Sequence, residues 1–140
     1  MTEENRRRNL RDEVDRADQA LRAAQALIDL DLHADAVSRA YYAAYHLLRA
    51  LLLSRGLEPK SHSGAIHLFN TEFVRPGLLP SSHNRLLGGL QRARELADYD
   101  PAVAFSAEDA RQSLDDARSF AREVLDLLRR EGWLGGAAAP

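Results

Sequence analysis

The chain has 140 residues, of which 45% are hydrophobic and 29% charged, and its formal net charge is −2 at pH 7. This length suits one domain with a single core, and the hydrophobic fraction excludes a chain that is mainly disordered. The near-neutral charge gives no global electrostatic reason to bind nucleic acid, and the absence of cysteine excludes disulfides and thiolate metal sites.

The first two expected helices are long and amphipathic. Apolar residues at helical spacing predict a helix over about residues 7–30, with a stripe made of Leu10, Val14, Ala17, Leu21, Ala24 and Ile28. A second helix is expected over about residues 34–55, because Gly56 is a natural C-terminal stop. Both segments are rich in alanine and leucine, which favour helix over strand.

Three further helices are expected downstream, each opening at a serine. The expected caps are Ser61 or Ser63, then Ser81 or Ser82, and finally Ser106, which forms a capping-box pattern with Asp109. The three helices should end near residues 73, 96 and 130. No segment alternates with period two, so strands are not expected.

These elements predict an all-α fold, an up-and-down antiparallel helical bundle of about five helices. No internal repeat or long linker divides the chain, so residues 1–132 should form a single domain. Residues 133–140 end in Gly-Gly-Ala-Ala-Ala-Pro and are expected to be a flexible tail. There is no apolar run of membrane-spanning length and no signal-like start, which favours a soluble cytoplasmic protein.

The second expected helix carries an unusual polar face. It combines Arg39, Tyr42, His46 and Arg49 with the small or apolar Ala43, Ala50 and Leu53. Arg39 and His46 are seven residues apart, about 10.5 Å along the axis and nearly eclipsed. Small residues permit a close helix neighbour, so Ala43, Ala50 and Leu53 are predicted to meet a second subunit. The spacing alone favours the simpler interpretation, in which Arg39 is a surface residue and His46 a half-buried structural histidine.

A second set of polar residues precedes the third helix. Lys60 and His62 can contact an anion at that helix N-terminus, while ordinary capping of the helix is the simpler interpretation. His62 and His67 are five residues apart and poorly aligned for a shared metal ion. We therefore expect no metal site and no cofactor.

The run from Ser38 to His46 (Ser-Arg-Ala-Tyr-Tyr-Ala-Ala-Tyr-His), continued by Arg-Ala-Leu-Leu at 49–52, resembles the signature helix of the HEPN-domain family. It is most similar to the small stand-alone prokaryotic branch. Further segments resemble that branch in the same order, at residues 58–64, 69–73, 77–80, 94–99 and 105–124. The resemblance covers about residues 15–128.

The resemblance implies a helical bundle that dimerises with its signature helices near the two-fold axis. Active members of the family are metal-independent RNases, often toxins partnered by a small nucleotidyltransferase-like antitoxin. Their motif arginine and histidine, which lie in a cleft between subunits, correspond to Arg39 and His46 here. Tyr42, Arg49, Lys60 and His62 are the expected supporting or binding residues.

This chemistry is sensible from the side chains alone. Histidine titrates near neutral pH and can move protons at a ribose hydroxyl, and arginine can hold a phosphate as charge develops. Two function classes remain open at this point. The first is a metal-independent RNase of toxin–antitoxin or defence type that acts at a homodimer cleft. The second is a non-catalytic module that binds a partner protein or a nucleotide.

Overall fold

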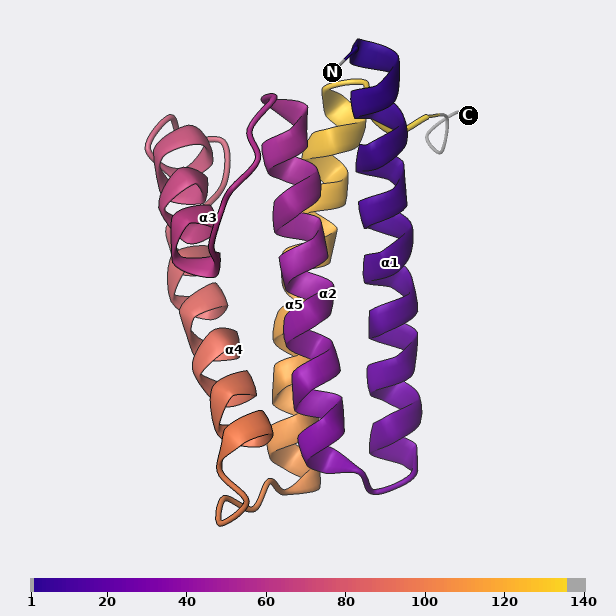
Figure 1. Ribbon diagram of the computed structural model, residues 1–140, viewed down its shortest axis with the longest axis vertical. Helices are drawn as coiled ribbons and strands as arrows, with labels where there is room; N and C mark the ends of the chain where they lie inside the picture. Colours follow the sequence, from indigo (N-terminus) through magenta and orange to yellow (C-terminus); the bar gives the residue numbers. More distant parts are fainter. Residues whose placement is uncertain (1, 136–140) are drawn as a thin grey trace.

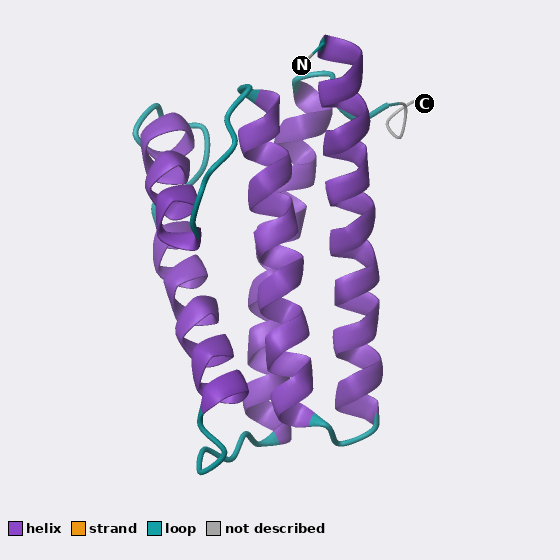
Figure 2. Ribbon diagram, in the orientation of Figure 1, coloured by secondary structure: helices purple, strands orange, loops and turns teal. Residues whose placement is uncertain are grey.

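The computed structural model describes residues 2–135 of the chain, and its regular elements are all helical. They are α1 (Glu3–Asp29), α2 (His33–Ser54), α3 (His62–Phe69), the short π-helix η1 (Asn70–Val74), α4 (Ser82–Tyr99) and α5 (Ala107–Arg130). Figure 2 shows no strand among the described residues, which confirms the all-α prediction. Within the same residues, no helix combines the length and apolar character needed to cross a membrane.

The four long helices run alternately up and down (Figure 1). Helices α1 and α2 form an antiparallel hairpin, and α4 and α5 form another. Helix α2 packs against α1, α4 and α5 and is therefore the centre of the bundle. After α2 the chain doubles back along the bundle, so the short α3 runs in the same direction as α2 and packs beside it.

Local capping explains where the helices begin and end. The hydroxyl of Thr2 accepts a hydrogen bond from the Asn5 N–H at 3.0 Å, so α1 begins four residues earlier than the apolar stripe predicts. Ser106 and Asp109 form the expected capping box at α5. Gly56 follows α2 with a φ of 73°, the left-handed conformation that a side chain disfavours.

Alanines bring α1 and α2 together. Ala17, Ala20 and Ala24 of α1 are buried, as are Ala43 and Ala50 of α2. These small side chains let the two helices pack closely, and the interface between them is extensive. The larger Leu47, Leu48 and Leu51 of α2 are also in the core, where they are at most 1% exposed.

The predicted subunit interface at Ala43, Ala50 and Leu53 is therefore wrong. Ala43 and Ala50 are fully buried inside one chain, and Leu53 is 7% exposed. The small side chains do accommodate a close helix neighbour, but that neighbour is α1 of the same subunit. Replacing both alanines with glutamate would place carboxylates in the core, so that change cannot test dimerisation.

The expected tail from residue 133 also needs correction. Trp133 and Leu134 pack against the core. Arg7 of α1 donates hydrogen bonds to the carbonyl oxygens of Gly132 and Trp133 at 2.7 and 3.2 Å, and its guanidinium lies over the Trp133 ring. The chain is therefore held at least through Leu134, and residues 136–140 of the predicted tail lie outside the described residues.

His83 is an unpaired histidine in the interior. It is 4% exposed, its ring packs edge-on against Phe120, and neither ring nitrogen has a hydrogen-bond partner in the described part of the chain. Burial lowers the pKa of His83, although the charge of Glu123 opposes this effect. The folded protein therefore favours the neutral ring.

We predict that His83→Leu stabilises the protein by about 1 kcal/mol at mildly acidic pH, because it removes two unpaired polar atoms. The lowered folded pKa makes wild-type stability fall as the pH drops below the unfolded histidine value of about 6.5, and the variant should lose this dependence. Urea denaturation at several pH values measures both effects. His67→Gln, at an exposed histidine, is the control. An unchanged pH slope in His83→Leu would contradict this interpretation.

Candidate functional site

A strip of polar side chains runs along α2 between α1 and α4. Its members, in order, are Arg39, Tyr42, His46 and Arg49, and we refer to them as the α2 strip. Arg39 and Arg49 are exposed, while Tyr42 and His46 are partly buried. The structure thus places all four predicted residues on one accessible side of the helix.

His46 is held by a carboxylate from the neighbouring helix. Its Nδ1 lies 3.0 Å from Oε2 of Glu13 in α1, and the two side chains are 21% and 10% exposed. An ionised carboxylate can only accept, so Nδ1 carries the hydrogen and donates it. In the neutral ring Nε2 is then the unprotonated nitrogen, available as a base.

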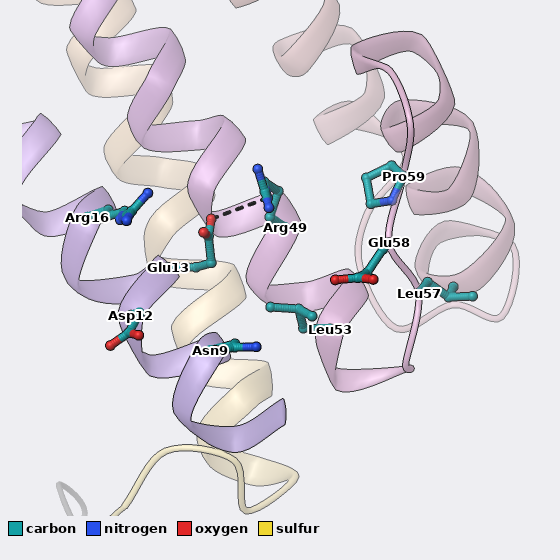
Figure 3. A pocket seen from close by; sticks show the side chains of 9 residues that line it. All are labelled: Asn9, Asp12, Glu13, Arg16, Arg49, Leu53, Leu57, Glu58 and Pro59. Carbon is teal, nitrogen blue, oxygen red and sulfur yellow. Dashed lines mark ion pairs between the residues drawn. The ribbon is translucent and has the colours of Figure 1, made fainter. Parts of the chain in front are cut away.

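Arg49 shares the same carboxylate. Its Nε lies 3.5 Å from Oε2 of Glu13, and Figure 3 shows the two side chains facing each other from α2 and α1. Burial alone raises the pKa of Glu13, but the hydrogen bond from His46 and the charges of Arg49, His46 and Arg16 outweigh it. The pKa of Glu13 therefore lies below its ordinary value, and the group stays ionised.

A polar cavity of about 270 Å³ opens beside this pair (Figure 3). It is lined by Glu13, Arg16 and Arg49 together with residues of the segment that follows α2, among them Glu58 and Pro59. The cavity gives water or a small polar group access to the Glu13 side of the strip.

Arg39 stacks on an aromatic ring. Its guanidinium carbon lies 4.9 Å from the centroid of Tyr42, one turn along α2. The side chain is exposed and stacked rather than paired to Glu13, whose oxygen is taken by His46 and Arg49. The N–H donors of the Arg39 guanidinium are therefore available to bind an anion.

His62 belongs to a different cluster. Its Nδ1 accepts from the Tyr41 hydroxyl and lies 3.4 Å from Nη2 of Arg94, and its ring packs on Tyr45. Burial and the charge of Arg94 lower the pKa of His62, and burial raises the pKa of Tyr41 to about 12. The structure therefore does not bring His62 to the His46 side of α2.

At the start of α3, where an anion site was one of the expectations, a side chain caps the helix instead. The Ser61 hydroxyl accepts a hydrogen bond from the Gly64 N–H at 3.0 Å, which is the capping alternative. Lys60 is exposed in the preceding loop. Among residues 2–135, no three His, Cys, Asp or Glu side chains gather where they could hold a metal ion.

Two residues of these clusters were missed by the sequence analysis. Glu13 lies between Leu10 and Ala17 on the buried face of α1, and a lone carboxylate on an apolar stripe was the available signal. Arg94 is 8% exposed, with its guanidinium against the rings of Tyr41 and Tyr42. It continues the buried stripe of His83, Leu87 and Leu90 on α4, so a lone cation at helical spacing was the available signal.

Comparison with known protein families finds a match to the HEPN domain over residues 10–129. The chain belongs to the HEPN domain family. This confirms the resemblance carried by residues 38–52 and the later segments, and the α2 strip lies within the matched region.

Individual HEPN relatives match nearly end to end. A UPF0332 protein of Gloeobacter violaceus is 39% identical over 84% of this chain and 94% of its own length. A protein of Methanocaldococcus jannaschii named "Putative toxin MJ0605" is 32% identical over 83% of this chain and 86% of its own. The crystal structure of TT1696 from Thermus thermophilus has a TM-score of 0.73 at 25% identity, covering 85% of this chain and 98% of that one.

We predict that Glu13→Gln lowers the free energy of unfolding at pH 7 by about 1–3 kcal/mol, because a buried charge-assisted hydrogen bond is lost. The pKa of Glu13 is lower in the folded than in the unfolded protein. Its contribution is therefore complete above the unfolded pKa and disappears as the pH falls through the folded one.

Urea denaturation of both proteins from pH 7 down to about pH 3 should show this difference shrinking on acidification. Asp12→Asn changes an exposed carboxylate one residue away and serves as the matched control, with an effect below about 0.5 kcal/mol. A difference that stays constant or widens on acidification would show that Glu13 is not held as a paired carboxylate.

Proposed function

We propose that this HEPN protein is a metal-independent RNase of toxin–antitoxin or defence type that acts in the cytoplasm. His46 moves the proton and Arg39 holds the phosphate. The observation that carries the proposal is the bond from His46 Nδ1 to Glu13, which leaves Nε2 free on an accessible strip with two arginines. The name of the Methanocaldococcus relative supports a toxin role.

The chemistry needs a base, a cation and an acid. Nε2 of His46 removes the proton of a ribose 2′-hydroxyl, and the resulting oxygen attacks the adjacent phosphorus. The bond to the 5′-oxygen breaks, which gives a 2′,3′-cyclic phosphate and, after protonation of that oxygen, a 5′-hydroxyl. Guanidinium donors of Arg39 stabilise the negative charge that develops on the phosphate.

We further propose that the site is completed in a symmetric homodimer. Within one subunit Arg39 and His46 lie two helical turns apart, about 10.5 Å along the axis, and Arg39 leans on Tyr42. A two-fold axis at the α2 strip supplies a second histidine to protonate the leaving oxygen and a second arginine for the phosphate. A nucleotidyltransferase-like antitoxin is the proposed partner protein.

The direct test is incubation of the protein with RNA in a chelator, followed by analysis of the ends. We expect cyclic phosphate and 5′-hydroxyl ends from the wild type. His46→Asn should lower the rate about 10²- to 10⁴-fold. Asparagine places an N–H near the position of Nδ1 and keeps the bond to Glu13, but it lacks Nε2, so the melting temperature should change little.

His67→Asn is the matched control at an exposed histidine and should cleave like the wild type. If the wild type produces no such ends, or His46→Asn cleaves at the wild-type rate, the proposed reaction is wrong. RNA or nucleotide binding without cleavage would instead support the non-catalytic module.

Arg39→Ala should slow cleavage and weaken RNA binding, because the phosphate contact is lost. Mixing Arg39→Ala with His46→Asn should restore part of the activity, since a shared site then pairs one intact arginine with one intact histidine. Arg85→Ala, at an exposed arginine of α4, is the control. A wild type that sediments as a monomer, or mixtures without regained activity, would contradict the shared site.

A further inference from the structure

The C-terminal end of α4 exposes two apolar side chains beside the α2 strip. Tyr99 is 73% exposed and Leu96, one turn earlier on the same face, is 46% exposed. We call these two residues the α4 platform. They border an open hollow of about 600 Å³ whose other lining residues are Arg92, Arg94, Glu95 and Asp100.

The Tyr99 side chain of the platform is contacted by Arg94. Its Nη1 donates a hydrogen bond to the Tyr99 hydroxyl at 3.3 Å, and its guanidinium carbon lies 5.9 Å from the Tyr99 ring centroid. Arg94 is 8% exposed, and its Nε has no hydrogen-bond partner in the described residues although the side chain lines the hollow. An exposed tyrosine is thus fixed by a buried cation.

The platform is continuous with the proposed catalytic strip. The guanidinium groups of Arg94 and Arg39 lie 5.6 and 4.9 Å from the ring centroid of the same residue, Tyr42. The ends of the two helices are also joined, because the Ser38 hydroxyl donates to Asp98 at 2.7 Å. Figure 1 shows the C-terminal end of α4 beside the N-terminal end of α2.

We propose that the α4 platform binds an unpaired base of single-stranded RNA, a substrate class that rests on the proposed ribonuclease function. The phosphates of the RNA strand would lie along His46 and Arg39, and a neighbouring base would stack on Tyr99. Aromatic rings bind bases of any sequence by stacking, and a ring held in place loses little freedom on binding.

The charges around the hollow balance, because the carboxylates of Glu95 and Asp100 offset the guanidinium groups of Arg92 and Arg94. The hollow therefore has no net positive charge to attract a phosphate. The two carboxylates can, however, accept hydrogen bonds from the exocyclic amino group of cytosine or adenine. The phosphates of the strand would instead contact Arg39, at the other end of the binding surface. Duplex RNA, whose bases are already stacked, should make no use of the platform.

The test uses His46→Asn as the parent protein, so that RNA is bound without being cut, and a fluorescent, unstructured RNA oligonucleotide in a chelator as the probe. Tyr99→Ala in this background should weaken binding about five- to hundredfold, the loss that stacking predicts. Tyr99→Phe keeps the ring and should retain most of the affinity. Leu78→Ala, at a 39% exposed leucine that precedes the N-terminal end of α4 and so lies at the other end of that helix from the platform, is the matched control.

Each outcome decides between interpretations. Equal affinity of the parent and Tyr99→Ala, or no binding by the parent, overturns the inference. A change in sedimentation of Tyr99→Ala without a specific loss of RNA affinity also overturns it and assigns the platform to contact with a second copy. Cleavage by the chain with His46 intact is measured separately on the same RNA. Tyr99-dependent binding without cleavage would therefore remove the proposed function and keep the subsite.

Discussion

The carboxylate of Glu13 is buried where α1 meets α2, and its main partners there, which keep it ionised, come from α2. A buried charge without partners costs several kcal/mol, so Glu13 at the α1–α2 interface requires cationic or hydrogen-bonding groups opposite it. His46 and Arg49, one turn apart on α2, meet that requirement with contacts of 3.0 and 3.5 Å. The same pairing that satisfies the core engages Nδ1 of His46, whose side chain is 21% exposed, and leaves Nε2 as the unprotonated nitrogen of the neutral ring.

The bundle leaves this imidazole accessible because its neighbours cover the other sides of α2. Alanines such as Ala43 and Ala50 let α1 approach on one flank, and the Tyr41 side of α2 packs against α3 and α4 through His62 and Arg94. Arg39, Tyr42, His46 and Arg49 remain between the two flanks. These four side chains are accessible because the neighbouring helices pack on the other sides of α2. One helix can therefore contribute both to the core and to the α2 strip.

Sequence patterns predict interactions between residues that are close along the chain, and they miss contacts between residues that are far apart along it. Periodicity and capping locate the long helices, and the Ser106–Asp109 box is confirmed because its partners are three residues apart. Periodicity also places Ala43 on one face, but it does not say whether a helix of the same chain or a second subunit covers that face. Glu13 pairs with His46 across 33 residues, and Arg7 with Trp133 across 126. The apolar stripe of α1 can single out Glu13, but no local pattern identifies the partner of either residue.

The central claim is that Glu13 fixes the proton of His46 on Nδ1 and leaves Nε2 as the base. Nitrogen NMR of the imidazole rings, recorded on the neutral histidine in the wild type and in Glu13→Gln, measures this directly. We expect His46 in the wild type to carry its hydrogen on Nδ1, with the population of this tautomer falling in the variant. A wild-type His46 protonated on Nε2, or a tautomer ratio that does not change in Glu13→Gln, would contradict the account.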